Sequence, residues 1–311
     1  MIKMYRGGQF FCLLLFLWGT LAARVLIITH NYNRPEFIEI QQKTFKKFLL
    51  DEYEFVVFND ARDEETARQI QTACSSYGIG CVRVSQEIHT RPYLARKPHD
   101  NLHQSNIRHA NCVQYSLDVL GFRHDDVVLI LDSDMFLIRP FSVSVYMHDK
   151  GIAAFIKRTP SKVYCLCPVL TFLAMNKLPE KTTLDFNTGT IDGWPVDSGG
   201  YTYHYLRQHP EVKMQGIDVL YSHQLFLADL HINRFNPDPV PNEVKATFYM
   251  NLGFNDKEIN FLLKKPDTFE FYLDKNFLHY RDGSNDTHQS REYHLNKLRM
   301  FKEFIDDIVK S

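Results

Sequence analysis

Charge of either sign is almost balanced in this sequence of 311 residues. Its 36 lysines and arginines face 37 aspartates and glutamates, which gives a formal net charge of −1 at pH 7. A protein that binds nucleic acid through a global positive field needs an excess of basic side chains. The composition therefore argues against a nucleic-acid partner and favours small partners. Low-complexity runs and solenoid repeats are also lacking, and with 44% hydrophobic residues the chain can bury a full-sized core.

No glycine-rich loop follows the first predicted strand, which covers residues 24–29. That strand leads instead into a polar turn at residues 30–35, HNYNRP. Dinucleotide sites of the G-x-G-x-x-G type and P-loops both need glycines at this place to approach phosphates closely. The sequence therefore argues against both classes, and phosphates must be held in another way.

Residues 1–23 are predicted to be a signal peptide or, if they are retained, a short membrane anchor. Lys3 and Arg6 precede an apolar run of roughly 14 residues, from Phe10 to Ala23, which ends in small side chains. A spanning helix needs about 20 apolar residues, and that length would consume the first strand. In either case we expect the body of the protein to be exported, with membrane association only through this segment.

Strands and helices alternate in the first part of the chain. Apolar runs bounded by polar turns predict strands, and apolar residues three and four apart predict helices. The β-α-β-α-β pattern indicates an α/β fold with a mostly parallel central sheet flanked by helices. The predicted strands are 24–29, 53–58, 81–84, 127–131, 152–157, 169–174, 248–252, 269–273 and 277–280. The predicted helices are 36–50, 64–77, 103–120, 201–208 and 290–310.

The stretch 127–131 predicts a strand that is buried on both faces, because it has five apolar residues in a row. Two carboxylates, Asp132 and Asp134, follow at its carboxyl end. Ligands of open α/β sheets bind at this end of the strands. Since alternate residues of an extended chain point the same way, the two carboxylates can converge on one hard cation that takes oxygen ligands.

Three further segments carry polar residues that are candidates for a functional site. Helical spacing puts Asn106 and His109 on one face of the helix over 103–120, either as a polar stripe that faces the two carboxylates or as satisfied groups of a partly buried helix. The segment 185–200 has three acids and four glycines without apolar periodicity, which is typical of a functional loop. The segment 278–285, LHYRDGSN, is mainly polar and comes directly after a predicted strand, as Asp132 and Asp134 do after the strand 127–131.

The D-x-D sequence at the end of an apolar strand, the β-α-β opening and the late His279-Tyr280-Arg281 together resemble the metal-dependent glycosyltransferases of the GT-A fold. The resemblance covers nearly the whole chain after residue 24. It implies a Rossmann-like sheet with a smaller acceptor-side lobe. In this scheme residues 24–140 are the nucleotide-binding half, and residues 141–311 are the acceptor-binding half with a C-terminal metal and phosphate segment, in the same globular unit.

The resemblance also implies a metal and a reaction. In this family the D-x-D motif and a C-terminal histidine hold Mn²⁺ or Mg²⁺ on the diphosphate of a UDP- or GDP-sugar, which gives its sugar to a glycan, lipid or protein acceptor. Carried over, Asp134 would be a direct metal ligand, Asp132 would face the ribose or a metal-bound water, and His279 would be the third protein ligand. The metal would neutralise the charge of the leaving nucleotide as a Lewis acid.

Further residues receive donor and acceptor roles from the same resemblance. The loops after the first two strands receive the nucleoside, and Arg281 with nearby small or amide residues can donate to the phosphates. Asn187 would touch the donor sugar, and Asp197 would take the proton of the acceptor hydroxyl if the enzyme inverts configuration. The candidate donor-binding residues are Thr29, Asn31, Asn33, Asp60, Asn106, Asp132, Ser133, Asn187, Arg281, Gly283 and Asn285.

Several of these residues also have structural explanations. Asn31 and Asn33 can be turn formers, and Asp60 can be a cap. Asp197 can cap the helix that follows it or, in a retaining enzyme, bind a sugar hydroxyl.

Two other functions compete for the whole chain. One is a degenerate GT-A domain that binds a glycan or a partner. The other is an aspartyl-phosphate phosphatase of the haloacid dehalogenase type. Such phosphatases carry D-x-D on the first strand and Thr or Val where this chain has Phe136.

Overall fold

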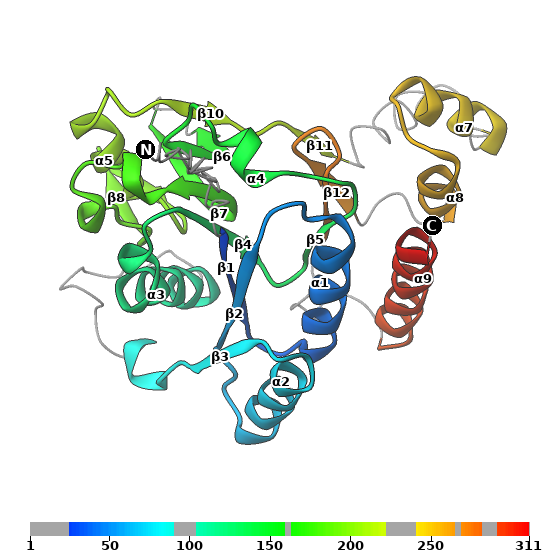
Figure 1. Ribbon diagram of the computed structural model, residues 1–311, viewed down its shortest axis with the longest axis horizontal. Coiled ribbons are helices and arrows are strands. Elements are labelled where there is room, and N and C mark those ends of the chain that lie inside the picture. The colour runs from blue at the N-terminus through cyan, green and yellow to red at the C-terminus, as the bar shows by residue number, and fades with distance from the viewer. Residues whose placement is uncertain are drawn as a thin grey trace, which may run out of the picture.

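The computed structural model describes residues 25–89, 104–158, 163–221, 241–264, 269–281 and 291–310. The predicted N-terminal signal or anchor segment lies outside these residues, as do two candidate donor-binding residues, Gly283 and Asn285. Figure 1 shows a twisted sheet in the middle of the molecule with helices on both sides of it. This arrangement confirms the predicted α/β class.

The central sheet has seven strands in the order β10-β6-β7-β4-β1-β2-β3. The pairs β1–β2, β1–β4, β2–β3 and β6–β10 are parallel, whereas β7 runs antiparallel to both of its neighbours. The sheet is therefore mostly parallel, as the sequence predicts. Its strands are β1 (Val25–Asn31), β2 (Tyr53–Asn59), β3 (Gly80–Arg83), β4 (Val127–Asp132), β6 (Ile152–Arg158), β7 (Tyr164–Ala174) and β10 (Met214–Gly216).

Most helices lie where the apolar spacing predicts them, but one predicted strand is wrong. Residues 248–252 have the aromatic side chains that favour strands, yet they belong mainly to a helix that begins after Pro241 and buries Tyr249 in the core. In the part of the chain that the structure describes, no helix is long and apolar enough to cross a membrane. The helices are α1 (Pro35–Phe48), α2 (Glu64–Tyr77), α3 (Gln104–Val119), α4 (Val143–Tyr146), α5 (Thr202–Gln208), α7 (Asn242–Asn251), α8 (Asp256–Lys264) and α9 (Arg291–Lys310).

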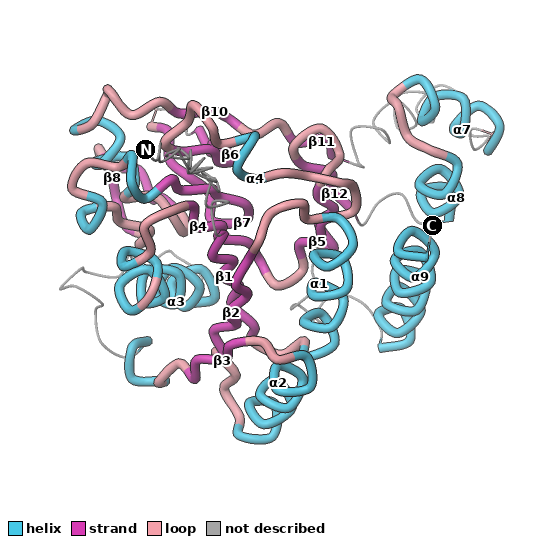
Figure 2. The backbone as a smooth tube through the Cα atoms, viewed as in Figure 1, coloured by secondary structure: helices cyan, strands magenta, loops and turns pink. Residues whose placement is uncertain are grey.

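Alternate side chains of β1 and β4 enter two separate apolar clusters. Val25 and Ile27 pack in the cluster that contains residues of α1 and α2, whereas Leu26 and Ile28 pack in the cluster that contains residues of α3. Figure 2 shows α3 on one side of these strands and α1 with α2 on the other. Because successive residues of a strand point to opposite faces, a strand covered on both sides needs an unbroken apolar run.

A second, antiparallel sheet joins the end of the chain to its middle. Its order is β11-β12-β13-β5, and the ring of Phe136 in β5 packs between Phe37 of α1 and Phe301 of α9, with ring centres 5.3 Å and 4.7 Å away. A two-stranded hairpin, β8–β9, completes the strands described. These strands are β5 (Met135–Leu137), β8 (Gly189–Ile191), β9 (Trp194–Val196), β11 (Val219–Tyr221), β12 (Phe269–Tyr272) and β13 (Phe277–Tyr280).

Two glycines with nearly the same positive φ test how tightly the loop between β9 and α5 is held. Gly199 has φ +83°, and a Cβ there would lie 1.8 Å from the carbonyl oxygen of Leu166. Gly193 in the β8–β9 turn has φ +80°, but nothing lies within 4 Å of its Cβ position. We expect Gly193→Ala to lower the free energy of unfolding by about 1 kcal/mol, the cost of a positive φ. Gly199→Ala adds a collision with backbone, so we expect a loss above about 3 kcal/mol.

Urea denaturation of the two variants beside the unchanged protein measures this difference. Equal losses in the two variants would show that the Leu166 carbonyl does not confine the loop.

Candidate metal centre

The sequence Asp132-Ser133-Asp134 lies where the chain leaves the central sheet and enters the second one. Asp132 ends β4, Ser133 and Asp134 form the turn, and Met135 begins β5. The side-chain amide of Gln41 in α1 is fully buried and donates to the backbone carbonyls of Asp132 and Met135, each at 3.1 Å. The backbone that carries both carboxylates is therefore fixed on each side of the turn.

His279 reaches Asp134 through strand pairing. In the antiparallel pair of β13 and β5, His279 lies opposite Met135, and the backbone N–H of Tyr280 donates to the carbonyl of Asp134 at 2.8 Å. The imidazole Nε2 of His279 then lies 3.3 Å from Oδ1 of Asp134. One ligand atom from each of Asp132, Asp134 and His279 lies within 4.8 Å of the others. The structure thus brings together the two carboxylates of the D-x-D motif and the histidine that the family resemblance implies.

This set of atoms fits a divalent cation. Two ligand atoms at right angles, each about 2.1 Å from one ion, are about 3 Å apart, and two on opposite sides are about 4.2 Å apart. The 3.3 Å between Asp134 and His279 is close to the first spacing, and the ligand atom of Asp132 lies within 4.8 Å of both. Two carboxylates and one imidazole leave room in the coordination shell for oxygens of a ligand or water.

Groups of opposite charge surround both carboxylates. His109 of α3 places Nε2 3.1 Å from Oδ1 of Asp132. Burial would raise the pKa of Asp132, but His109 and His279 lower it to about 2. Burial would lower the pKa of His279, but the carboxylates of Asp134 and Glu270 raise it to about 10. At neutral pH these values correspond to an ionised Asp132 and a protonated His279.

The candidate residues at the end of β1 and in the turn after it are Thr29, Asn31 and Asn33. Thr29 is fully buried. The side chain of Asn31 folds back on the turn, where its Oδ1 accepts from the backbone N–H of Arg34 at 3.0 Å and its Nδ2 donates to the Arg34 carbonyl at 2.8 Å. Asn33 lies half-buried in the same turn. Asn31 is therefore a turn former, and contact of these three residues with a nucleotide stays a prediction.

Asp60 follows β2 and holds an arginine of α3. Nε of Arg108 lies 2.7 Å from Asp60 Oδ2, and Nη2 donates to Oδ1 at 2.8 Å. The guanidinium lies over the ring of Tyr32, 4.9 Å from its centre. The cap of α2 is Asp63, so the capping explanation for Asp60 is wrong for this helix. Asp60 instead orients Arg108 and Tyr32 at the carboxyl edge of β1 and β2.

Asn106 lies at the contact between α3 and the loop over 185–200, and Asn187 lies within that loop. The hydroxyl of Ser198 donates to the backbone carbonyl of Asn106 at 3.0 Å. Nδ2 of Asn187 donates to Oδ1 of Asp185 at 2.9 Å, within the loop. The loop is thereby tied to the helix that also carries His109.

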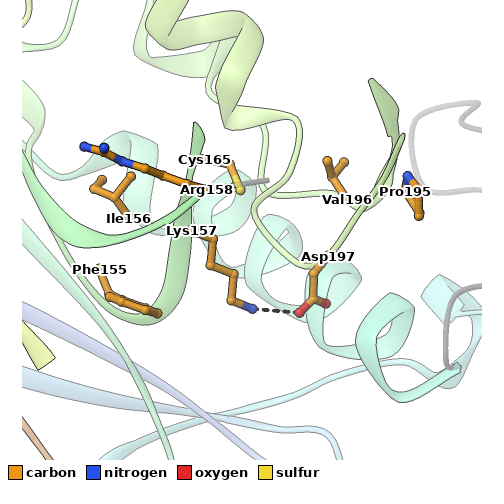
Figure 3. Close-up of a pocket in the computed structure, with 8 residues that line it drawn as sticks. All are labelled: Phe155, Ile156, Lys157, Arg158, Cys165, Pro195, Val196 and Asp197. Carbon is orange, nitrogen blue, oxygen red and sulfur yellow. Dashed lines mark hydrogen bonds and ion pairs between the residues drawn. The ribbon is translucent and has the colours of Figure 1, made fainter. Parts of the chain in front are cut away.

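Asp197 pairs with a lysine and does not cap α5. Nζ of Lys157, near the end of β6, lies 2.7 Å from Asp197 Oδ2, and α5 has no side-chain cap. Figure 3 shows the two side chains pointing toward one another at the wall of a cavity of about 360 Å³. Burial would raise the pKa of Asp197, but Lys157 lowers it. The other lining residues are Phe155, Ile156, Arg158, Cys165, Pro195 and Val196.

Arg281 lies at the end of β13, beside the metal centre. Its Nε is 3.2 Å from Oε1 of Glu270, and its side chain is 40% exposed. Gly283 and Asn285, the other predicted phosphate donors, fall outside the described residues. The buried Ser133 of the D-x-D turn and Arg281 remain candidates for contact with a donor.

Sequence reasoning missed several residues that the structure places in or beside the site, among them Gln41, Glu270 and Lys157. Glu270 is a single acid among the aromatic residues of β12, and a buried polar group of this kind needs a specific partner; that pattern is the signal that could have found it. Gln41 lies in the polar run 41–44, QQKT, and carries no such signal. Lys157 carries no such signal, because a lysine near a strand end is usually solvated.

No protein-family model matches the chain, and no curated protein matches it. Among solved structures, the chain is similar to a mannosyltransferase of Pyrobaculum calidifontis in complex with GDP-Man and Mn²⁺, with 15% identity, a TM-score of 0.37, and coverage of 63% of this chain and 55% of that chain. It is similar to glucosyl-3-phosphoglycerate synthase of Mycobacterium tuberculosis with Mn²⁺ and UDP, with 12% identity, a TM-score of 0.37, and coverage of 62% and 69%. A mannosyltransferase of S. cerevisiae matches with 10% identity, a TM-score of 0.36, and coverage of 52% and 59%. The chain thus spans little more than half of the first of these proteins.

A second buried imidazole lies next to the metal centre and can be tested through pH. Nε2 of His30 is 2.9 Å from the hydroxyl of Ser116, and its ring stands edge-on to that of His109, with centres 5.9 Å apart. Burial and the neighbouring His109 lower the pKa of His30 from 6.5 to about 3. As the pH falls below 6.5, His30 becomes protonated in the unfolded chain but stays neutral in the folded protein. The free energy of unfolding therefore decreases.

Between pH 7 and pH 5, we expect the free energy of unfolding of the unchanged protein to fall by about 2 kcal/mol more than that of His30→Gln. Chemical denaturation at both pH values measures it. His148→Gln removes an exposed histidine and serves as the control. A difference for His30→Gln that does not change with pH would contradict the burial of a neutral His30.

Proposed function

We propose that this protein is a metal-dependent glycosyltransferase that moves a sugar from a nucleotide-diphosphate sugar to an acceptor hydroxyl. The observation that carries the proposal is the 3.3 Å contact between His279 and Asp134. The two residues come from distant parts of the sequence and meet at the carboxyl end of β4, the edge where α/β sheets bind ligands. With Asp132 they form the set that would hold Mn²⁺ or Mg²⁺.

The residues around this set suit a diphosphate leaving group. A bound ion would act as a Lewis acid on the diphosphate, whose negative charge grows as the glycosidic bond breaks. Arg281 shares Glu270 with His279 and is partly exposed, so its guanidinium can donate to the same phosphate oxygens. Tyr32 with Arg108 over its ring marks the edge of β1 and β2 where the nucleoside would lie.

The cavity beside Asp197 is the proposed place of the acceptor. Its volume of about 360 Å³ is in the range of small-molecule sites. Asp197 is kept ionised by Lys157, so its carboxylate can accept a hydrogen bond from an acceptor hydroxyl and, in an inverting reaction, take its proton. His109 links the cavity to the metal centre, since it contacts Asp132 at 3.1 Å and its charge also acts on Asp197.

The phosphatase alternative fits the structure less well. Those enzymes use the first Asp of D-x-D as a nucleophile on the first strand, whereas Asp132 ends the fourth strand in chain order and its carboxylate is paired with His109. A degenerate domain that binds a donor without turnover has the same expected geometry as an enzyme. Only a measurement of turnover distinguishes the two.

The first test is metal dependence of the purified full-length protein. We expect hydrolysis or transfer from a UDP- or GDP-sugar only with Mn²⁺ or Mg²⁺. Asp134→Asn keeps the shape of the side chain but removes its charge, and we expect it to lower the metal-dependent rate about 100-fold or more. Asp149→Asn changes an exposed acid that pairs with Lys213 and serves as the control.

A thermal-shift screen of nucleotide sugars with and without Mn²⁺ identifies the donor, because a ligand that binds the native state raises Tm. Metal-independent turnover, or full activity in Asp134→Asn, would contradict the proposal. A metal-dependent shift with a donor but no turnover with any acceptor would favour the binding domain.

The second test concerns Asp197. If Asp197 is the base, removing its counter-charge in Lys157→Gln raises its pKa, and we expect the acidic limb of the kcat/KM profile to move up by about one pH unit. Arg158→Gln removes a charge from the same cavity wall without breaking the pair with Asp197. A limb that stays in place in Lys157→Gln, with only KM changed, would show that Asp197 binds a hydroxyl and does not take its proton.

A further inference from the structure

Glu270 is a buried carboxylate in a strand that is otherwise aromatic. It lies between Phe269 and Phe271 in β12 and is only 6% exposed. Burying a charge is costly unless it is paired and hydrogen-bonded. The partners of Glu270 therefore indicate why the position carries an acid.

The second sheet places Glu270 next to His279 on the side away from the D-x-D turn. Glu270 and His279 are direct partners in the ladder between β12 and β13, and His279 is the partner of Met135 in the ladder between β13 and β5. Side chains of directly opposed residues in antiparallel strands are close neighbours. The row runs from the carboxylate of Glu270, through the imidazole, to the residue that follows Asp134.

Each nitrogen of the imidazole faces a different carboxylate. Nδ1 of His279 lies 2.9 Å from Oε2 of Glu270, and Nε2 lies 3.3 Å from Oδ1 of Asp134. An ionised carboxylate only accepts hydrogen bonds, so the nitrogen that faces Glu270 carries the hydrogen. Nε2, which faces Asp134 of the D-x-D turn, is then the nitrogen that would lose its hydrogen and give its lone pair to a cation.

Glu270 is itself held in this orientation. The hydroxyl of Tyr272 donates to its Oε2 at 3.0 Å, and Nε of Arg281 lies 3.2 Å from its Oε1. Both oxygens therefore have partners. Glu270 is not among the three residues whose ligand atoms converge, so it acts behind His279.

We propose that Glu270 is a positioning residue, which keeps the hydrogen of His279 on Nδ1 and aims Nε2 at the metal while it fixes Arg281 beside the same site. The inference rests on the proposed metal site. Carboxylates that accept from the second ring nitrogen of a ligating histidine fix its tautomer and orientation, and their loss costs about 10- to 100-fold in metal affinity.

Titration of the full-length protein with Mn²⁺ alone, followed by calorimetry, tests the role. We expect the Kd of Glu270→Gln for Mn²⁺ to be about 10- to 100-fold weaker than that of the unchanged protein. Tyr272→Phe removes one bond to Glu270 and leaves the carboxylate in place, so we expect a loss of about threefold; it also replaces the first variant if that one does not fold.

Glu258→Gln is the matched control. Glu258 is a buried acid in α8 that also pairs with an arginine, Arg139, through both of its oxygens at 2.9 Å and 2.6 Å. We expect this variant to lose stability and keep its Mn²⁺ affinity. A nitrogen NMR spectrum of His279 with Mg²⁺ gives a second readout: the hydrogen should reside on Nδ1 in the unchanged protein, whereas Glu270→Gln should show a mixture of the Nδ1-H and Nε2-H tautomers.

The outcomes separate the two proposals. Absence of Mn²⁺ binding in the unchanged protein would overturn the metal site and this inference with it. Normal Mn²⁺ binding with the same Kd in Glu270→Gln would overturn the positioning role alone. Equal weakening in Glu270→Gln and Glu258→Gln would also overturn it, because the effect would then be one of general stability.

Discussion

The antiparallel pairing of β5 with β13 is the constraint on which the candidate metal centre depends. It joins the turn after the central strand to the end of the chain, and the bond from the Tyr280 N–H to the Asp134 carbonyl continues that ladder into the turn itself. The separation of Asp134 and His279 is therefore set by backbone hydrogen bonds and by the aromatic packing around Phe136. Side chains held on strands, or on a short turn that strands fix at both ends, vary little in position, which is what a metal site requires.

The central part of this arrangement follows from the sequence, because it depends on local patterns. The apolar run that becomes β4, and the two carboxylates at its end, are readable from residue order alone. His279 became a candidate only through resemblance to a family, since the register that brings it to Asp134 is a property of the tertiary fold. The residues that support the site, Glu270 and Lys157, lie on strands whose partners the sequence does not specify.

The wrong prediction has a similar cause. Residues 248–252 carry aromatic side chains of high strand propensity, but propensity for strands mainly reflects packing on a half-buried sheet surface. Here a helix that begins after Pro241 buries Tyr249 in the core and leaves Phe248 and Met250 exposed. A helix with one buried aromatic residue satisfies the core without a neighbouring strand, and nothing within those five residues distinguishes the two solutions.

Opposite charges alternate across the whole site, and this alternation keeps its carboxylates available to a cation. Glu270, His279 and Asp134 form one series, and Asp132, His109 and Asp197 form another that ends at Lys157. Each carboxylate is thereby kept ionised or paired in surroundings that would otherwise penalise its charge. A divalent ion that takes the place of the proton on His279 would raise the local charge by one unit only. The two negative charges of a donor's diphosphate would then more than offset that unit, so metal and donor would favour each other's binding.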